Sequence, residues 1–159
     1  MQARPATLAD SNLLLLWRND PGTLAFSVQQ RVTRAEHEEW LGHTLADPNR
    51  VLMVVAAESP IGTYRLDWIG TRPDRACGPV PLVEISITVA PEHRGFGYAV
   101  PVIDLASQHA VRLGATCLLA RVYYQNERSR RAFLRAGYKF YLEDRAGDQL
   151  VFETYRASH

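Results

Sequence analysis

The sequence predicts a mixed α/β fold of the α+β type, in which helices flank a central sheet that is mostly antiparallel. Residues 83–123 support this prediction, because they show the pattern of a strand, a glycine loop, a helix and a second strand. Two further pairs of apolar segments, at 51–69 and 138–156, each surround a turn and predict antiparallel hairpins. A chain of 159 residues, 47% of them hydrophobic, can bury one core, so we expect a single domain over residues 1–159.

The composition limits the classes of partner. Eighteen basic residues against 17 acidic ones give a net charge of +1, which predicts binding neither to nucleic acid nor to an anionic membrane. Cys77 and Cys117 are isolated thiols, and the N-terminal region shows neither a signal pattern nor an apolar run that could cross a bilayer. A cytoplasmic protein is therefore the simplest expectation. The five histidines are scattered without paired ligand spacing, so no metal site is predicted.

The N-terminal third predicts a strand and two capped helices. Residues 3–7 can form a short strand, a helix is expected up to residue 17, and residues 17–22 stop it. A second helix is expected from residue 34 to about 46. Each helix follows a capping-box pattern, Thr7 with Asp10 and Thr33 with Glu36. We interpret Trp17 and Trp40 as core residues.

The next segments predict a hairpin and a loop. Residues 51–57 and 61–69 are apolar and β-branched, with Glu58, Ser59 and Pro60 between them. Residues 70–81 contain three prolines and two glycines, which predicts a loop.

The central unit is the most strongly patterned part of the chain. In residues 83–89, apolar residues alternate with Glu84, Ser86 and Thr88, which indicates a strand. From Tyr98 the apolar residues follow a three-four spacing that predicts a helix, and Gly114 stands where a left-handed C-terminal cap belongs.

Gly95 and Gly97 lie between this strand and helix. Glycine adopts positive φ without steric cost, so successive N–H groups can point outward at the start of the helix, as in phosphate-binding loops. An ordinary tight turn is the alternative.

The C-terminal third completes the sheet. Residues 115–123 predict a strand that a right-handed crossover makes parallel to 83–89. Asn126 can cap a helix over 127–136 that Gly137 ends, and residues 138–144 and 149–156 predict a hairpin with its turn at 146–148.

Three motifs resemble the acetyl-CoA-binding core of the GNAT N-acetyltransferase superfamily. They are Arg94-x-x-Gly97-x-Ala99 after a strand that contains a Glu, Asn126-x-x-Ser129, and Ala136-Gly137-Tyr138. The resemblance covers most of the chain and implies a splayed parallel strand pair with acetyl-CoA as cosubstrate. The cofactor-binding residues that it implies are Ile87, Val89, Arg94, Gly95, Phe96, Gly97, Tyr98, Ala99, Asn126 and Ser129.

The same resemblance implies direct attack of a neutral amine on the acetyl carbonyl. Glu84 could remove the proton, although an ion-paired strand glutamate is an equal alternative. A backbone N–H near Val89 is the implied oxyanion donor.

Phe133 stands where many relatives carry a tyrosine acid. Tyr123 or Tyr124 could protonate the sulfur instead, water could, or the coenzyme A thiolate could leave without an acid, and we expect the last two together. Cys117 is expected to be a core residue, which disfavours an acyl-cysteine intermediate.

The acceptor is predicted less sharply. Segments 17–21, 36–41 and 62–67 resemble enzymes that acetylate nucleotide-linked amino sugars in pseudaminic or legionaminic acid biosynthesis, with Arg18, Asn19 and Arg65 as the implied substrate contacts. A small-molecule amine is therefore the expected partner. Protein N-termini, polyamines or aminoglycosides are alternative acceptors, a non-catalytic acetyl-CoA-binding module is the alternative class, and a homodimer stays open.

Overall fold

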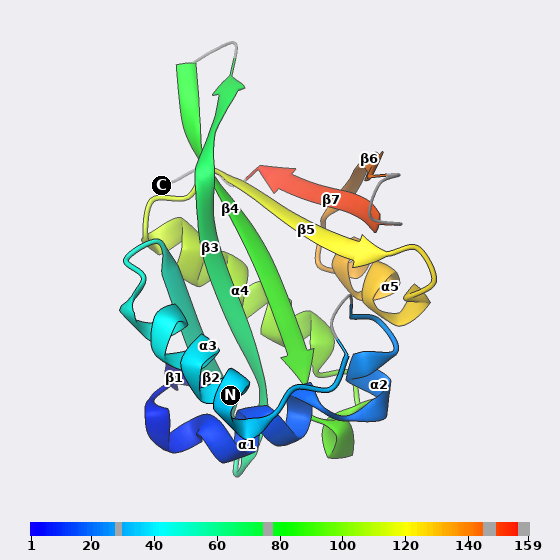
Figure 1. The fold of residues 1–159 in the computed structure, drawn as a ribbon. Coiled ribbons are helices and arrows are strands. Elements are labelled where there is room, and N and C mark those ends of the chain that lie inside the picture. Colours follow the sequence, from blue (N-terminus) through cyan, green and yellow to red (C-terminus); the bar gives the residue numbers. More distant parts are fainter. Residues whose placement is uncertain (28–29, 75–77, 145–148, 156–159) are drawn as a thin grey trace.

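The computed structural model describes residues 1–27, 30–74, 78–144 and 149–155. A seven-stranded sheet runs through it in the order β1-β2-β3-β4-β5-β7-β6 (Figure 1). The strands are β1 (Gln2–Pro5), β2 (Arg50–Ala56), β3 (Pro60–Asp74), β4 (Gly78–Val89), β5 (Cys117–Tyr123), β6 (Lys139–Asp144) and β7 (Gln149–Tyr155). β4 and β5 are parallel and the other neighbouring strands antiparallel, so the predicted fold class is confirmed.

Helices cover both faces of this sheet. They are η1 (Leu8–Asp10), α1 (Ser11–Arg18), α2 (Pro21–Leu24), α3 (Arg34–Ala46), η2 (Pro91–His93), α4 (Ala99–Arg112) and α5 (Glu127–Arg135). Leu52 and Val54 of β2 pack with Trp17 and Leu41 of α1 and α3 on one face. The larger core lies on the other face, between the sheet and the helices α4 and α5. Among the described residues, no helix is long and apolar enough to cross a bilayer.

The parallel pair separates after a short contact. Only three residue pairs join β4 to β5, from Leu82 with Cys117 to Glu84 with Leu119. Beyond them β4 continues to Val89 beside β3 alone, and β5 continues beside β7 (Figure 1). The strands therefore diverge toward the glycine loop, as the resemblance implied.

The local end signals account for most of the helix boundaries. Both predicted capping boxes are formed, and the Asn126 side chain accepts a hydrogen bond from the Ser129 N–H at 3.2 Å. Gly114 and Gly137 have φ values of 95° and 86°, as the predicted C-terminal caps require. The turn predicted at 146–148 and Cys77 lie outside the described residues.

The loop predicted over residues 70–81 is wrong. Most of residues 70–81 lie in β3 and β4, which form an antiparallel arm that extends beyond the other strands (Figure 1). Pairing between the two strands outweighs the turn signals of the prolines there. The segment 17–22 ends α1 at Arg18, as predicted, and Asp20 then caps the short helix α2 that Pro21 begins.

Two histidines, His37 and the partly buried His109, couple stability to pH. Burial lowers the pKa of His37, on α3, and of His109, on α4, whose Nδ1 lies 2.7 Å from the Tyr64 hydroxyl. Burial also raises the pKa of Tyr64 to about 12. In the unfolded chain each histidine takes up a proton near pH 6.5, whereas in the folded chain it does so only at a lower pH. The free energy of unfolding should therefore be constant above about pH 6.5 and fall as the pH drops below it.

Urea unfolding at pH values of about 7.5 and about 5.5 measures this effect, and His109→Gln should weaken it by removing one titrating group. Asp10 affects stability in a different pH range. The Arg4 guanidinium lowers the pKa of Asp10 to about 2, so the contribution of Asp10 to the free energy of unfolding is lost only below about pH 4. Equal stability of the wild type at the two pH values would show that the histidines are not held neutral.

Candidate active site

The glycine loop has the geometry of an anion-binding site. Gly95 and Gly97 have φ values of 84° and 82°, which residues with a Cβ rarely adopt. A Cβ built on either glycine meets nothing within 4 Å, so the protein itself does not fill the space that they face. α4 begins at Ala99, directly after the loop, and its first N–H groups have no partner within the helix. The loop therefore has the positive-φ glycines and the open space that a phosphate-binding loop requires.

The splayed end of β4 presents its backbone toward the gap. Ala90 N–H donates to the Ile61 carbonyl at 2.9 Å, which makes these two residues a hydrogen-bonded antiparallel pair. Hydrogen-bonded and non-hydrogen-bonded pairs alternate along such a ladder. Val89, opposite Gly62, and Ile87, opposite Tyr64, are then non-hydrogen-bonded positions on the β3 side. Their N–H and C=O groups point to the opposite side, where β5 has moved away.

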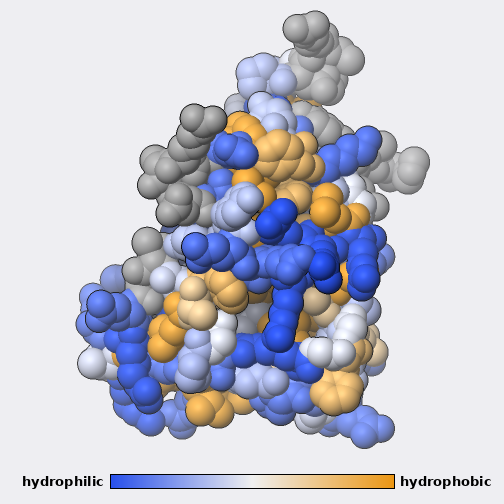
Figure 2. All heavy atoms as spheres, turned by 90° about the vertical axis from the view of Figure 1, so that its right-hand side faces the viewer, coloured by the Kyte–Doolittle hydropathy of each residue, from blue (hydrophilic) through white to orange (hydrophobic). Residues whose placement is uncertain are grey.

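A cavity of about 650 Å³ lies between this loop, the splayed strand and α5, and we call it the glycine-loop cavity. Nine of the ten predicted cofactor residues line it, and the exception is Phe96, whose side chain is 75% exposed. The predicted residues at the cavity are Ile87, Val89, Arg94, Gly95, Gly97, Tyr98, Ala99, Asn126 and Ser129. Figure 2 shows the face that carries α2 and α5, with a band of hydrophilic residues across its middle.

Sequence reasoning missed the wall that α2 and Phe26, two residues after it, add to this cavity, which we call the α2 wall. Gly22, Thr23 and Phe26 line it, although they precede the loop by about 70 residues in the sequence. Arg128 of α5 also lines the cavity, which singles it out among the four arginines of that helix.

Arg94 ties the α2 wall to the loop. Its Nη1 pairs with Asp20, its Nη2 donates to the Thr23 hydroxyl at 2.8 Å, and its Nε donates to the Val89 carbonyl at 3.2 Å. This hydrogen bond from Arg94 lowers the pKa of the Asp20 carboxyl. A Cβ on Gly22 would meet Nη1 at 2.4 Å, so any larger residue there would displace the guanidinium from this position. The side chain of Arg94 thus positions the cavity wall.

We expect Arg94→Gln to weaken acetyl-CoA binding about tenfold, the equivalent of one charge-assisted hydrogen bond. Asp20→Asn should act in the same direction, because Asp20 holds the guanidinium without lining the cavity itself. Isothermal titration calorimetry measures both dissociation constants. If Asp20→Asn leaves the affinity unchanged and only Arg94→Gln lowers it, Arg94 contacts acetyl-CoA directly and does not act by positioning the cavity wall.

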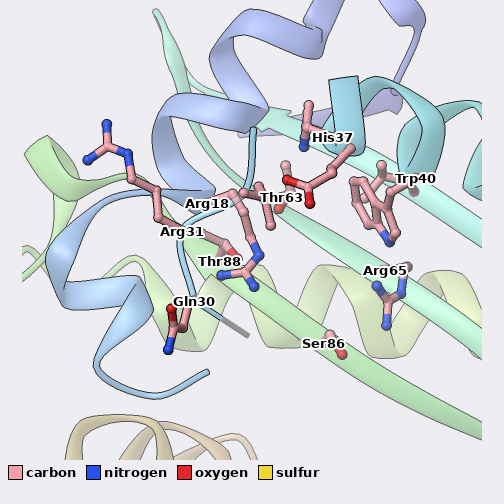
Figure 3. Close-up of a pocket in the computed structure, with 12 residues that line it drawn as sticks. Arg18, Gln30, Arg31, His37, Trp40, Thr63, Arg65, Ser86 and Thr88 are labelled. Atoms are coloured by element: carbon pink, nitrogen blue, oxygen red, sulfur yellow. The ribbon is translucent and has the colours of Figure 1, made fainter. Parts of the chain in front are cut away.

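A second cavity of about 630 Å³ lies on the α3 side of the sheet, and we call it the α3 cavity (Figure 3). The residues that line it are Arg18, Gln30, Arg31, Val32, Glu36, His37, Trp40, Leu52, Thr63, Arg65, Ser86 and Thr88. Thr88 lines the glycine-loop cavity as well. The two cavities therefore meet at Thr88, on the splayed part of β4.

The structure separates the three predicted substrate contacts. Arg18 and Arg65 line the α3 cavity, although they come from α1 and β3. The amide of Asn19 instead bonds to the Val32 backbone twice, accepting from its N–H at 2.9 Å and donating to its C=O at 2.8 Å. The Asn19 side chain thus fixes the backbone at Val32, and it does not line either cavity.

Trp17 and Trp40 have different surroundings. Trp17 is 1% exposed in the core, as predicted, whereas Trp40 is 37% exposed and lines the α3 cavity. The core prediction for Trp40 is therefore wrong, because the helix face that it shares with His37 and Leu41 reaches past the edge of the apolar core.

Glu84 lies apart from the junction. Its carboxylate pairs with Arg121 of β5, and it belongs to neither set of described residues that line the two cavities. Along β4, Glu84 is four residues from Thr88, a separation of about 13 Å at the usual rise of a strand. This distance exceeds the roughly 3 Å reach of direct proton transfer. The geometry favours the ion-paired alternative.

We therefore expect Glu84→Gln to lower kcat/KM by less than about threefold, rather than the roughly 10²-fold to 10⁴-fold typical of a general base. Steady-state kinetics with the best acceptor, over a range of pH, measures the effect. A fall of about a hundredfold or more with an intact fold would restore Glu84 as the base, acting through water.

The residues predicted to be inert are buried. Phe133 is 2% exposed and packs edge-on against Tyr138, with 5.1 Å between the ring centroids. Cys117 is fully buried in β5. Among the described residues, no group of three or more His, Cys, Asp or Glu side chains could hold a metal ion.

Comparison with known proteins agrees with this geometry. A family model described as an acetyltransferase (GNAT) domain matches residues 2–139. None of the curated proteins searched matches the chain.

Solved structures share the fold at identities of 16–22%. The aminoglycoside acetyltransferase AAC(6')-Ib in complex with coenzyme A has a TM-score of 0.81 and 16% identity, over 98% of this chain and 94% of that chain. Ribosomal-protein-alanine N-acetyltransferase from Brucella melitensis has a TM-score of 0.76 and 22% identity, over 98% of this chain and 100% of that chain. Spermidine N-acetyltransferase from Vibrio cholerae, in complex with CoA and spermine, has a TM-score of 0.78 and 17% identity, over 97% of this chain and 94% of that chain.

The family model spans most of the sheet, the splayed strand pair and the glycine loop. The chain belongs to the GNAT acetyltransferase family.

Proposed function

We propose that the protein transfers an acetyl group from acetyl-CoA to a primary amine of a small molecule, by direct attack within a ternary complex. The observation that carries this proposal is the junction of the two cavities at Thr88. The cosubstrate can enter from the loop side and the acceptor from the α3 side, so both reacting groups reach one point of β4. Such placement alone can supply much of the rate acceleration.

The glycine-loop cavity fits a coenzyme A pyrophosphate. Gly95 and Gly97 leave open space, and the N-terminus of α4 adds partial positive charge beside backbone N–H groups. Arg128 lines the same cavity and can pair with a further phosphate. Acetyl-CoA supplies the activated acetyl group when bound.

Residues of the splayed strand would act on the reacting carbonyl. The N–H of Val89 points into the gap and can donate to the developing oxyanion. The acceptor amine must arrive neutral, and it loses its proton to water in the α3 cavity. The coenzyme A sulfur leaves as a thiolate whose pKa is near 8.5, so the reaction needs no tyrosine acid in place of Phe133.

The specific acceptor that we propose is an amino group on a nucleotide-linked sugar. Two of the three residues that implied it, Arg18 and Arg65, line the α3 cavity together with the aromatic Trp40. Aminoglycosides, polyamines and protein N-termini are alternatives, since structures with a similar fold carry those names. Homodimer formation stays a prediction that analytical ultracentrifugation tests.

Thiol release from acetyl-CoA across a panel of amines tests the proposal. The panel should contain nucleotide-linked amino sugars, free amino sugars, aminoglycosides, polyamines and a peptide with a free N-terminus. Release that depends on one class of amine is the expected result. A protein that binds acetyl-CoA but stays at background with every amine would be a non-catalytic binding module.

A further inference from the structure

The charged residues of the α3 cavity bear on the class of acceptor. Among the described residues that line it, three are arginines, Arg18, Arg31 and Arg65, and one, Glu36, is acidic. The Glu36 carboxylate already accepts hydrogen bonds from the Thr33 N–H at 2.6 Å and the Thr33 hydroxyl at 2.7 Å, as part of the α3 capping box. A cavity of this kind repels polycations and attracts anions.

Arg18 and Arg65 lie on the two sides of one space. Figure 3 shows the Arg18 side chain reaching into the cavity from α1 and Arg65 standing on β3, with Ser86 of β4 in the floor near them. Arg31 extends away from this pair in the same view. The guanidinium groups of Arg18 and Arg65 are therefore the two that an acceptor in the cavity would meet first.

Arg65 is held by an ion pair, and Arg18 is partly buried. Asp67 accepts from Nε and Nη2 of Arg65 at 2.8 Å, which fixes the orientation of that guanidinium. Arg18 is half-buried beside the core residue Trp17, and burial lowers its pKa, although a guanidinium stays charged near neutral pH. Pre-positioned guanidinium groups bind oxyacid groups with little loss of conformational entropy.

A buried histidine also lines the cavity. His37 is 3% exposed, lines the cavity, and its Nε2 has no hydrogen-bond partner among the described residues. Its ring lies 5.5 Å from that of Trp40. Polar groups this deeply buried are normally satisfied, so the space beside them suits a polar ligand.

We propose that the α3 cavity selects an amine that carries an oxyacid group, phosphate or carboxylate, and that Arg18 and Arg65 bind this group. The inference rests on the proposed function and deepens it. The anion would lie between the two guanidinium groups, and the sugar or other ring would lie against the Trp40 indole. The amine would then face Thr88, where the glycine-loop cavity opens.

The test compares amines of one scaffold that differ in charge. Glucosamine, glucosamine 6-phosphate and the carboxylate 2-amino-2-deoxygluconic acid serve as probes, with spermine as the polycation. We expect kcat/KM for at least one of the anionic amines to exceed that of glucosamine by about tenfold or more at low salt, and to fall as salt is added. The phosphate and carboxylate arms identify the preferred group. A preference for spermine or for neutral glucosamine would overturn the inference.

Arginine variants locate the effect. Arg18→Gln and Arg65→Gln should each lower kcat/KM for the preferred anionic amine about tenfold, and for glucosamine less than about threefold. Arg34 lies on α3 outside the cavity lining, so Arg34→Gln should leave kcat/KM unchanged for the anionic amine and for glucosamine. Arg65→Lys keeps the charge and should be intermediate, which covers the case in which a glutamine variant does not fold. Equal losses with charged and neutral amines would contradict the assignment.

Calorimetry separates this inference from the proposed function. If no amine supports thiol release, the proposed function fails. Titration of glucosamine 6-phosphate and of 2-amino-2-deoxygluconic acid into the protein with coenzyme A then still decides the inference. Binding of either that Arg18→Gln abolishes supports an anion site, whereas binding of neither excludes it.

Discussion

Gly97→Val is expected to abolish acetyl-CoA binding, with a loss of affinity of at least about a hundredfold, while the protein stays folded. Gly97 has a φ of 82° and faces open space in the glycine-loop cavity, so the valine side chain would occupy the position of the phosphate oxygens. Loss of two charge-assisted hydrogen bonds, at about 1.5 to 3 kcal/mol each, exceeds the factor of a hundred. Calorimetric titration with acetyl-CoA measures the dissociation constant.

The matched control is Gly70→Val. Gly70 also has positive φ, at 124°, and faces open space, but it lies in β3 and lines neither cavity. Both variants therefore carry backbone strain of about 1 to 3 kcal/mol, which thermal unfolding reports. Equal acetyl-CoA affinity in the two variants would remove the phosphate site from this loop.

Thr88→Phe is expected to lower kcat by about a hundredfold or more, with a much smaller effect on acetyl-CoA affinity. Thr88 lines both cavities, so a phenyl ring there would stand between the acetyl group and the amine. A displacement of about 1 Å between reacting groups can cost about a hundredfold in rate. The phosphates bind at the glycine loop, away from this side chain, and should keep most of the binding energy.

Thr71→Phe is the control for Thr88→Phe. This variant introduces the same substitution on an exposed part of β3, and Thr71 lines neither cavity. Steady-state rates and calorimetry on the two variants separate a blocked junction from general damage to the sheet. A Thr88→Phe enzyme with normal kcat would show that transfer takes place elsewhere.

The central unit could be predicted from sequence because its signals are local. The alternation in β4, the glycines at 95 and 97 and the apolar spacing of α4 each depend on residues close in the chain. The cofactor residues follow from those elements, and nine of the ten line one cavity. Phe96 does not, because its side chain points to solvent from the middle of the loop.

The acceptor side could be predicted only in part. Trp40 and Arg65 come from α3 and β3, and only the packing of α3 over the sheet brings them to one cavity with Arg18. Periodicity placed Trp40 on an apolar helix face but could not show where the core ends. Asn19 had the right residue type for a sugar contact, yet a backbone 13 residues away takes both of its amide atoms.

The arm formed by β3 and β4 shows the limit of local signals in another way. Pro73, Pro79 and Pro81 predicted a loop, but each can lie in an antiparallel pair where its missing N–H is not needed. The α2 wall was hidden for a related reason, since the pairing of Asp20 with Arg94 joins residues 74 positions apart.

Initial-velocity kinetics tests the central claim most directly. Rates are measured while acetyl-CoA is varied at several fixed concentrations of the best acceptor. Because the two cavities meet at Thr88 and Cys117 is buried, the account predicts intersecting double-reciprocal lines, the pattern of a ternary complex. Parallel lines, which indicate a covalent acyl-enzyme, would contradict direct transfer between the two cavities.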